Sequence, residues 1–443
     1  MAGGPVLQGS RRTSMYIAFS PTRPRWHLIA SEPDRTFMSR IVCKFGGTSV
    51  ADIDRIQATA DRVKSIVDEG NQVAVVVSAM SGTTDQLISW TREIAAVHDA
   101  REYDVVLASG EQVTIGLLAL ALQSLGVSAR SWLGWQLPIR TDGAHSSARI
   151  QDFSADGPAA CLDKHEVAIV AGFQGIGPDG RLTTLGRGGS DLTAVALAAA
   201  LGADRCDIFT DVDGVYTADP RIVAKARKLD KITYEEMLEM ASQGAKVLQT
   251  RSVELAMTQR VRLQVRSSFN DTSGTFVVDE DEILEQEVVS GIAYSRDEAK
   301  ITLLNVADRP GVAARVFGPL ANAAVNVDMI VQSASEDGGS TDITFTLDRA
   351  HLDKALSVLE QEKSAIGHGG ALADSNVVKV SVIGVGMRSH AGVAARMFET
   401  LAERGINILV ISTSEIKVSV LIEEEYAELA LRALHSAYGL DAI

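Results

Sequence analysis

Apolar positions from Ile41 onward follow two alternating patterns along the chain. Short continuous runs rich in β-branched residues, IVCKF from residue 41 and QVAVVVSAM over 72–80, are typical of strands buried on both faces. Between them, the stretch 50–70 repeats apolar residues every three or four positions, which is the spacing of one helix face. This alternation predicts an α/β fold whose mainly parallel sheet is sandwiched by helices.

The same alternation continues to about residue 270. It predicts helices at about 84–98 and 111–125, strands near 127–133 and 167–173, an alanine-rich helix after Ser190, the strand RCDIFTDV (205–212), helices to about 260 and a closing segment VRLQVRSSFN (261–270). We therefore place the first large domain at residues 38–275.

Beyond about residue 285 the chain contains an internal repeat. Residues 308–335 align with residues 389–416, so that Gly392 lies 81 positions after Gly311. Each copy has a strand, a helix preceded by glycine, two more strands and a second helix, an order that predicts two ferredoxin-like units. We place these units at 285–365 and 376–443, with GHGGALADS (367–375) as the linker between them.

Charge and length exclude several classes of protein. Acidic residues outnumber basic ones 57 to 42, giving a net charge of −15, whereas nucleic acids and anionic membrane surfaces select a basic footprint. The most apolar stretches, 115–122 and 194–203, are shorter than the ~20 residues of a membrane span. We expect a cytoplasmic protein that binds neither nucleic acid nor membrane.

Residues 1–37 differ from the rest of the chain. They carry five arginines and no acid before Glu32, which fits a disordered transit segment or a non-native extension ahead of Met38. The three cysteines, Cys43, Cys161 and Cys206, have no C-x-x-C spacing and are interpreted as small buried residues in a reducing compartment.

One glycine motif is misleading. GIGPDG (175–180) matches the dinucleotide-binding pattern G-x-G-x-x-G, but neither a helix nor an acid at the required distance follows it. Because proline and aspartate occupy its centre, we interpret it as a hairpin turn.

Two other glycine clusters are candidates for phosphate binding. In KFGGTS, Gly46 and Gly47 can bring backbone N–H groups close to an anion, and Lys44 supplies a full positive charge. The alternative is a helix start capped by Thr48 or Ser49. A second cluster, GRGGSD (186–191), lies at the start of another predicted helix and has its own cation, Arg187. Two such turns suit a phosphate donor that faces an anionic acceptor.

Further polar groups could complete such a site. TDVDGVYTADPR (210–221) follows a predicted strand, where ligands gather in open sheets, and the alternative is a long polar loop with a D-G turn. Singly, each remaining candidate is more typical of a cap or a surface position, and only their joint occurrence carries weight. These candidates are the hydroxyls of Ser78 and Thr84, the Glu111 carboxylate and the Lys246 ammonium.

These motifs occur in an order that resembles a known family. KFGGTS, SAMSGTTD, SGE, TTLGRGGSD, TDVDGVYTADPR, GAKVL and the duplicated C-terminal unit are together similar to the aspartokinases, the aspartate 4-kinases of the amino-acid kinase family. The resemblance covers the chain from Met38 and implies an amino-acid kinase fold followed by two ACT domains. It implies ATP-dependent phosphorylation of the β-carboxylate of L-aspartate, the first step of lysine, threonine, methionine and diaminopimelate biosynthesis, under feedback control.

The resemblance also implies roles for individual residues. Lys44, Asp191 and Lys246 would be catalytic, and Ser78, Thr84, Glu111 and Arg187 would hold aspartate. ATP would contact Lys44, Phe45, Gly46, Gly47, Arg187, Ser190, Thr210, Asp211, Tyr216, Arg221, Lys246 and Val247. Mg²⁺ would be bound mainly through the nucleotide, with no dedicated protein metal site.

In the repeated units the resemblance implies an effector site for lysine, threonine or both. Its residues would be Asp308, Gly311, Asn326, Asp328 and Gln332 in the first unit, and Val393, Asn407, Ile408, Ser414 and Glu415 in the second. A strand from about 288–300 would complete the second unit, and pairing of ACT domains between subunits would give a homo-oligomer or an α/β hetero-oligomer.

Two other functions remain open. One is a related amino-acid kinase with another acceptor, because the fold alone does not select the substrate. The other is a catalytically inactive amino-acid sensor, against which the retention of Lys44, Glu111, Arg187, Asp191 and Lys246 speaks.

Overall fold

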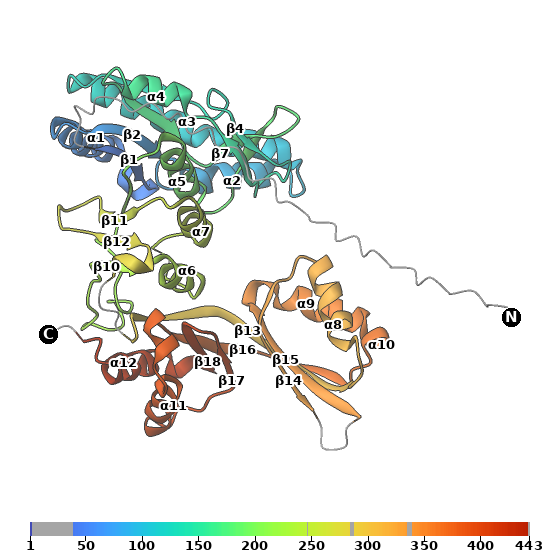
Figure 1. Cartoon of the computed structure of the whole chain (residues 1–443). Helices are drawn as coiled ribbons and strands as arrows, with labels where there is room; N and C mark the ends of the chain where they lie inside the picture. Colours follow the sequence, from blue (N-terminus) through green and yellow to red (C-terminus); the bar gives the residue numbers. More distant parts are fainter. Residues whose placement is uncertain (2–38, 246, 284–287, 335–338, 442–443) are drawn as a thin grey trace.

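The computed structural model describes residue 1 and residues 39–245, 247–283, 288–334 and 339–441 of the chain. The N-terminal part is an eight-stranded sheet in the order β10-β12-β11-β9-β1-β2-β6-β3 (Figure 1). Only the β11–β12 pair is antiparallel, so the predicted mainly parallel sheet is confirmed. Its strands are β1 (Arg40–Phe45), β2 (Gln72–Val77), β3 (Ala129–Trp132), β6 (Val167–Ala171), β9 (Arg205–Thr210), β10 (Lys231–Thr233), β11 (Leu263–Ser267) and β12 (Thr275–Val278).

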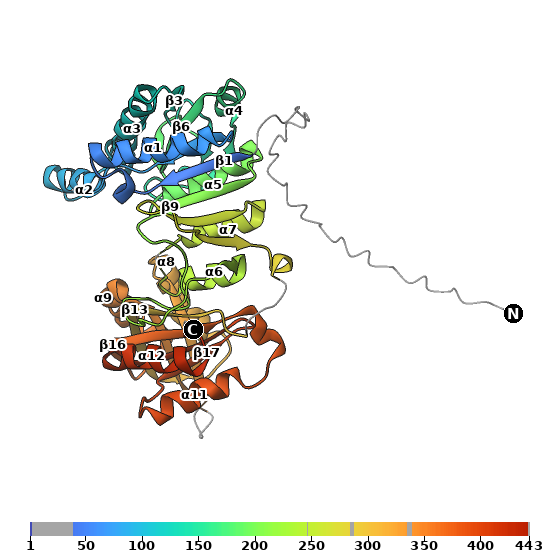
Figure 2. The same ribbon diagram turned by 90° about the vertical axis from the view of Figure 1, so that its left-hand side faces the viewer.

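Helices cover both faces of this sheet, as Figure 2 shows around β1. One face packs against α1 (Ile53–Asp68) and α3 (Ala100–Ser124). The other packs against α4 (Asp156–Leu162), α5 (Gly189–Leu201), α6 (Tyr234–Ser242) and α7 (Thr250–Gln259). Successive strand residues point to opposite faces of the sheet. Ile41 and Cys43 therefore pack on the side of α1 and α3, and Val42 packs on the side of α5. Lys44 therefore points to the α5 side of the sheet.

Helix α3 begins earlier than predicted. The expected helix of 111–125 is in fact 25 residues long, and its N-cap Asp99 accepts a hydrogen bond from the Arg101 N–H. The polar and β-branched residues before Glu111 hide the helical period in the sequence. These residues are nevertheless helical, because one face of the helix is buried in the protein.

Among the described residues, α3 is the one helix long and apolar enough to cross a membrane. Half of its apolar window is buried inside the protein, and Ile115, Leu118 and Leu122 belong to the core against the sheet. Its apolar character is therefore explained by its place as a core helix.

A small sheet at one end of the large one was not predicted. Its order is β5-β4-β7-β8, and its strands are β4 (Ile139–Thr141), β5 (Ile150–Phe153), β7 (Gln174–Ile176) and β8 (Leu182–Thr184). β7 and β8 pair antiparallel, and the Gly177 N–H donates to the Arg181 carbonyl. The hairpin interpretation of GIGPDG is thus confirmed.

The C-terminal part forms one continuous six-stranded sheet in the order β14-β15-β13-β16-β18-β17. Two long strands join its halves, since β13 (Gly291–Ala307) pairs antiparallel with β16 (Gly370–Ile383) along most of both strands. The predicted linker is wrong over 370–375, because these residues are the first part of β16 and residues 370–374 pair with Lys300–Leu304. The remaining strands are β14 (Val327–Ala334), β15 (Ser340–Asp348), β17 (Val410–Thr413) and β18 (Lys417–Glu423).

The repeat seen in the sequence is also a repeat in the structure. Helices α8 (Val312–Asn322) and α11 (Val393–Glu403) both have 11 residues, and each follows a glycine in the left-handed region, with φ of 91° at Gly311 and 98° at Gly392. The second helices of the units are α9 (Leu352–Gln361), followed by the short α10 (Lys363–Ile366), and α12 (Ala427–Ala437).

Candidate active site

The carboxyl ends of β9, β1, β2 and β6 lie at one edge of the parallel sheet, and three of the predicted motifs lie at this edge. Phe45 ends β1 and stacks on Phe209 of β9, with ring centroids 4.6 Å apart. The Ser78 N–H donates to the Phe45 carbonyl, which ties the end of β2 to the end of β1. Ligands of open α/β sheets bind at such edges.

Lys44 meets Asp191 at this edge. The Lys44 ammonium lies 2.6 Å from Asp191 Oδ1, and the two side chains are 11% and 9% exposed. Asp191 belongs to the first turn of α5, so the first glycine turn and the second come together in space although they are far apart in the sequence. The structure thus brings together the two candidate phosphate turns.

The first glycine turn, which follows β1, lies close to the loop that follows β2. A Cβ at Gly47 would lie 3.2 Å from the Ala79 carbonyl oxygen, and one at Gly46 would lie 3.3 Å from the Lys44 ammonium. Gly46 precedes a short 3-10 turn (Gly47–Val50) without a side-chain cap, and the cap of α1 is Asp52. The alternative of a Thr48 or Ser49 cap is therefore wrong.

The second glycine turn opens α5. Gly188, with φ of 71°, precedes the helix, and a Cβ there would lie 2.1 Å from Gln249 Cγ. Ser190 packs against Gly172 at the end of β6, where a Cβ would lie 2.6 Å from the Ser190 hydroxyl oxygen. Only glycine meets both the positive φ and the close packing at 188.

Glu111 is the third group at the edge. Its side chain is 3% exposed, and Oε1 accepts a hydrogen bond of 3.0 Å from the Ala79 N–H at the end of β2. Oε2 is buried without a hydrogen-bond partner among the described residues. Burial raises the pKa of this carboxyl to about 7, although the Ala79 N–H lowers it. A buried carboxylate oxygen without a partner is a ready acceptor for a ligand cation.

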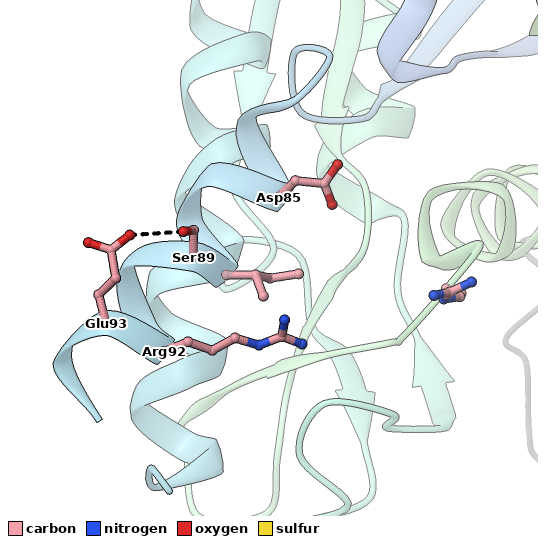
Figure 3. A pocket seen from close by; sticks show the side chains of 6 residues that line it. Asp85, Ser89, Arg92 and Glu93 are labelled. Atoms are coloured by element: carbon pink, nitrogen blue, oxygen red, sulfur yellow. Dashed lines mark hydrogen bonds between the residues drawn. The ribbon is translucent and has the colours of Figure 1, made fainter. Parts of the chain in front are cut away.

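A cleft of about 490 Å³ lies between α2 (Thr83–Ile94) and Arg187. Figure 3 shows Asp85, Ser89, Arg92 and Glu93 along α2 at this cleft, with the Ser89 hydroxyl donating to Glu93 over 2.9 Å. Thr84 lies in the first turn of the same helix. Arg187, predicted from the sequence, is thus a lining residue of an open cleft beside the second glycine turn.

The predicted nucleotide cluster follows β9. The Thr210 hydroxyl donates to Asp211 over 3.2 Å, and the Tyr216 hydroxyl donates to Asp213 over 3.0 Å. Burial, and then the hydrogen bond to Asp213, raise the pKa of Tyr216. The Arg221 guanidinium instead pairs with Asp219 at 2.7 Å.

The GAKVL segment is described only in part. Val247 packs against the core on the α5 side of the sheet. Lys246 lies outside the described residues.

The predicted effector residues lie in the C-terminal sheet. Asp328 is the second residue of β14 and accepts a hydrogen bond of 2.5 Å from the buried Lys379 ammonium, which also lies 2.6 Å from Glu298. Beside these residues, Met329 of β14 and Val410 of β17 share one buried cluster, so the starts of the two edge strands meet. The sequence did not point to Lys379 or Glu298, because each lies inside a strand pattern.

The other predicted effector residues surround the starts of α8 and α11 and the strands that follow. Asn326, Gln332, Asn407 and Glu415 are exposed, and Ile408 is half-buried. The Val393 carbonyl accepts a hydrogen bond of 2.7 Å from the Tyr438 hydroxyl, and the Ser414 N–H donates to the Lys417 carbonyl over 2.8 Å. The Asp308 N–H donates to the Gly339 carbonyl over 3.3 Å.

Helix α6 connects the two parts of the chain. Glu236 accepts a hydrogen bond of 3.0 Å from the Val385 N–H, and Glu239 forms a salt bridge of 2.9 Å with Lys417. One turn further, the Ser381 hydroxyl donates to Gln243 over 3.2 Å. The sequence did not reveal this contact, since its residues are separated by more than a hundred positions.

Comparisons with known protein families agree with this architecture. A profile described as the amino acid kinase family matches residues 39–267, and ACT domain profiles match residues 300–363 and 380–438. The fold and the site therefore define the class as a kinase of the amino acid kinase type with C-terminal ACT domains.

Individual relatives narrow the class. The aspartate kinase of Stutzerimonas stutzeri is 56% identical over 406 residues, which are 91% of this chain and 98% of that protein. The aspartokinase of Pseudomonas aeruginosa is 56% identical over 407 residues, with coverage of 91% and 98%. A crystal structure of E. coli aspartokinase III with aspartate and ADP covers 90% of this chain and 99% of that chain, with a TM-score of 0.76 and 29% identity. The chain belongs to the aspartokinases of the amino acid kinase family, so the predicted family and fold are confirmed.

Proposed function

We propose that this protein transfers the γ-phosphoryl group of ATP to the β-carboxylate of L-aspartate, giving 4-phospho-L-aspartate. The observation that carries the proposal is the Lys44–Asp191 pair between two glycine turns at the carboxyl edge of the sheet. Transfer between two anions needs positive charge and backbone donors where the phosphoryl group passes, and this edge has both.

On the donor side, the Lys44 ammonium lies against the transferring phosphoryl group and stabilises charge in the transition state. Gly46 and Gly47 donate from the backbone beside it, and the lack of a Cβ at Gly46 leaves room for the Lys44 ammonium. The Gly46 N–H would have to leave the Phe209 carbonyl, to which it donates here over 3.4 Å. Asp191 holds Lys44 in place through the 2.6 Å contact.

On the acceptor side, the free Oε2 of Glu111 accepts the aspartate ammonium. Arg187 at the cleft binds the α-carboxylate in a bidentate fork. Ser78 and Thr84, at the end of β2 and the start of α2, contribute hydroxyls.

Nucleotide binding is proposed for the loop after β9 and its neighbours. Thr210, Asp211 and Tyr216 follow that strand, and the phosphates face the Ser190 turn. Phe45, Val247, Arg221 and Lys246 are the further proposed nucleotide contacts. Arg221 would have to leave Asp219 to reach a ligand, since the two are paired here.

Mg²⁺ is proposed as the companion of ATP, bound mainly through the phosphates. Asp191 is paired with Lys44 and Glu111 accepts a backbone N–H, so the carboxylates of this edge fit a metal that keeps few protein ligands. When bound, the metal neutralises phosphate charge.

Feedback control by lysine, threonine or both is proposed for the C-terminal sheet. A crystal structure of E. coli aspartokinase III with lysine and aspartate covers 89% of this chain, with a TM-score of 0.72 and 30% identity. The proposed effector residues are those at the starts of α8 and α11 and along β14 and β17. An effector site shared between subunits supports a homo-oligomer or an α/β hetero-oligomer.

The proposed division of the chain is a catalytic domain over 38–275 and regulatory units over 285–365 and 376–443, the second completed by 288–300. The pairing of Gly291–Ser295 with Lys379–Ile383 supports the last point. The proposed extension of 1–37 falls in residues outside those described, apart from residue 1. The cytoplasm is the proposed location.

The test is a coupled assay of ADP release with aspartate, glutamate or acetylglutamate as acceptor. Turnover is expected with aspartate, and lysine and threonine, singly or combined, should reduce it. Activity with glutamate but not aspartate would overturn the proposed acceptor. Lysine binding without turnover on any acceptor would favour an amino-acid sensor.

A further inference from the structure

Helix α3 carries two buried acidic side chains on one face. Glu111 lies seven residues after Asp104, which is two helical turns, and Asp104 is fully buried. Glu111 reaches the end of β2, whereas Asp104 reaches the small sheet. The proposed function uses Glu111 and leaves Asp104 without a role.

Asp104 accepts hydrogen bonds from two separate segments. Its Oδ2 accepts from His145 Nδ1 at 2.8 Å, from the Ser146 N–H at 3.0 Å and from the Thr184 N–H at 3.1 Å. Its Oδ1 accepts from the Thr184 hydroxyl at 2.7 Å and from the Ser146 hydroxyl at 3.4 Å. Several donors on one carboxylate offset the free-energy cost of burying it.

These bonds hold the chain just before Arg187. Thr184 ends β8, three residues ahead of Arg187, and the Leu185 N–H donates to the Phe173 carbonyl. Gly186, with φ of 76°, lies against Ser146, whose carbonyl oxygen would be 3.2 Å from a Cβ there. Asp104 and its hydrogen-bonded neighbours therefore fix the backbone that precedes Arg187.

Glu111 is fixed to the same helix with little freedom. A Cβ at Gly110 would lie 2.7 Å from the Ala79 Cβ, so α3 packs tightly on the end of β2 at this point. The rise of an α-helix separates Asp104 and Glu111 by about 10 Å along its axis. One rigid helix thus determines the positions of both proposed ligands of the amino acid.

We infer that Asp104 is a positioning residue for substrate recognition, which holds the Thr184–Arg187 segment so that Arg187 meets the α-carboxylate while Glu111 meets the ammonium. The inference rests on the proposed function, because it assumes these two roles. It assigns Arg187 to the α-carboxylate and not to ATP, the other contact that the resemblance implies for this residue. It therefore predicts that Asp104 acts on recognition of the α-carboxylate and leaves recognition of the ammonium and of ATP unchanged.

The test compares Thr184→Val, which removes the hydroxyl donor at nearly constant volume, with Thr184→Ser, which keeps it. Thr184→Val should raise the KM for aspartate about tenfold at an unchanged KM for ATP, and Thr184→Ser should restore the wild-type KM within about twofold. β-Alanine, which is aspartate without its α-carboxylate, is then measured as a competitive inhibitor. Its Ki should be the same for all three proteins, because Arg187 has no group to bind in it.

Two results would overturn the inference. One is an unchanged aspartate KM in Thr184→Val, and the other is an equal loss of aspartate and β-alanine affinity, which indicates general disruption of the site. If Thr184→Val does not fold, His145→Ala removes another donor near the surface and should raise the aspartate KM about threefold. Calorimetry of aspartate binding to the same variants separates the positioning role of Asp104 from the proposed reaction. If the wild-type protein binds aspartate but shows no turnover, only the proposed reaction is overturned.

Discussion

The Lys44 ammonium and Asp191 Oδ1 lie 2.6 Å apart, each side chain about nine-tenths buried, although β1 and α5 are separated by most of the catalytic domain. The pair brings two glycine turns together at the edge of the sheet where we propose that the phosphoryl group binds. The Asp191 carboxylate offsets the desolvation cost of the lysine, and it defines where the ammonium stands relative to the turns.

Removal of the Lys44 charge is the most direct test of this edge. Lys44→Met should lower kcat about a thousandfold, because the charge that develops on the phosphoryl group loses its nearest cation. The matched control is Lys64→Met, which removes an exposed lysine paired with Asp68 and should keep wild-type turnover. Near-normal turnover of Lys44→Met would remove this residue from the mechanism.

The same variant should also be less stable, because Asp191 is left buried without its partner. The double variant Lys44→Met with Asp191→Asn should recover most of the lost melting temperature while it stays inactive. Thermal unfolding followed by circular dichroism measures both. A double variant no more stable than the single one would show that the pair contributes little to folding.

Glu111 predicts a pH dependence of substrate binding. Burial raises the pKa of this carboxyl to about 7, and only the ionised form pairs with the aspartate ammonium. The kcat/KM for aspartate should therefore fall about tenfold per pH unit below 7. Glu111→Gln should have a low kcat/KM that does not change with pH in this range. A wild-type profile that is flat between pH 5.5 and 8 would contradict this assignment.

Glu111 also predicts a pH dependence of stability. A carboxyl whose folded pKa lies above its unfolded value binds more protons in the folded state, so the free energy of unfolding falls as pH rises from about 4.5 to 7. Glu111→Gln should therefore stabilise the protein at pH 8, by about 3 kcal/mol at most, and change little at pH 4.5. Urea unfolding at the two pH values measures the difference. Equal effects at both values would show that ionisation of Glu111 is not the cause.

Gly47 tests the close approach of the first glycine turn. A methyl group there would lie 3.2 Å from the Ala79 carbonyl oxygen and would push the ends of β1 and β2 apart. Gly47→Ala should raise the KM for ATP several-fold and lower kcat. Gly116→Ala is the control, since no atom lies within 4 Å of its Cβ and alanine favours a helix interior. Unchanged ATP kinetics in Gly47→Ala would show that the approach is not needed.

Helix α6 contacts the C-terminal sheet, and we propose that feedback control reaches the active site through this contact. Lys417→Ala removes the 2.9 Å salt bridge between the C-terminal sheet and Glu239. It should raise the effector concentration for half-inhibition about threefold or more, with uninhibited kcat within twofold, because coupling between sites is small in free energy. The control is Arg432→Ala, which breaks an exposed salt bridge with Glu428 on the same helix and not the contact with α6. Unchanged inhibition by lysine and threonine would exclude this salt bridge from the route.

Local pattern predicted a large part of the fold. The continuous apolar runs and the glycine that opens each repeated helix were sufficient to predict the parallel sheet and the equivalence of Gly311 and Gly392. The start of α3 was missed because polar and β-branched residues hide its helical period, and the first half of β16 was missed because its residues have weak strand propensity and pair with β13.

The same division holds within the site. The glycines, Lys44 and Arg187 stand in two motifs that each could also be an ordinary helix start, and their joint occurrence favoured an anion site. The free oxygen of Glu111 follows from the end of β2 and the burial of α3, and the hydrogen bonds to Asp104 come from donors on two distant segments. The spacing of residues in the sequence does not predict hydrogen bonds between such distant segments.

By itself, the sequence determined the α/β class and the duplicated C-terminal unit, since these depend on residue period, and the type of chemistry followed from the resemblance of its ordered motifs to those of the aspartokinases. The tertiary structure alone decided that Lys44 faces Asp191, that Glu111 keeps one oxygen without a partner, and that α6 contacts the C-terminal sheet. The physical reason is that parallel strands collect their carboxyl ends at one edge whatever the length of chain between them, and burial then sets the charge and hydrogen bonding of each group there.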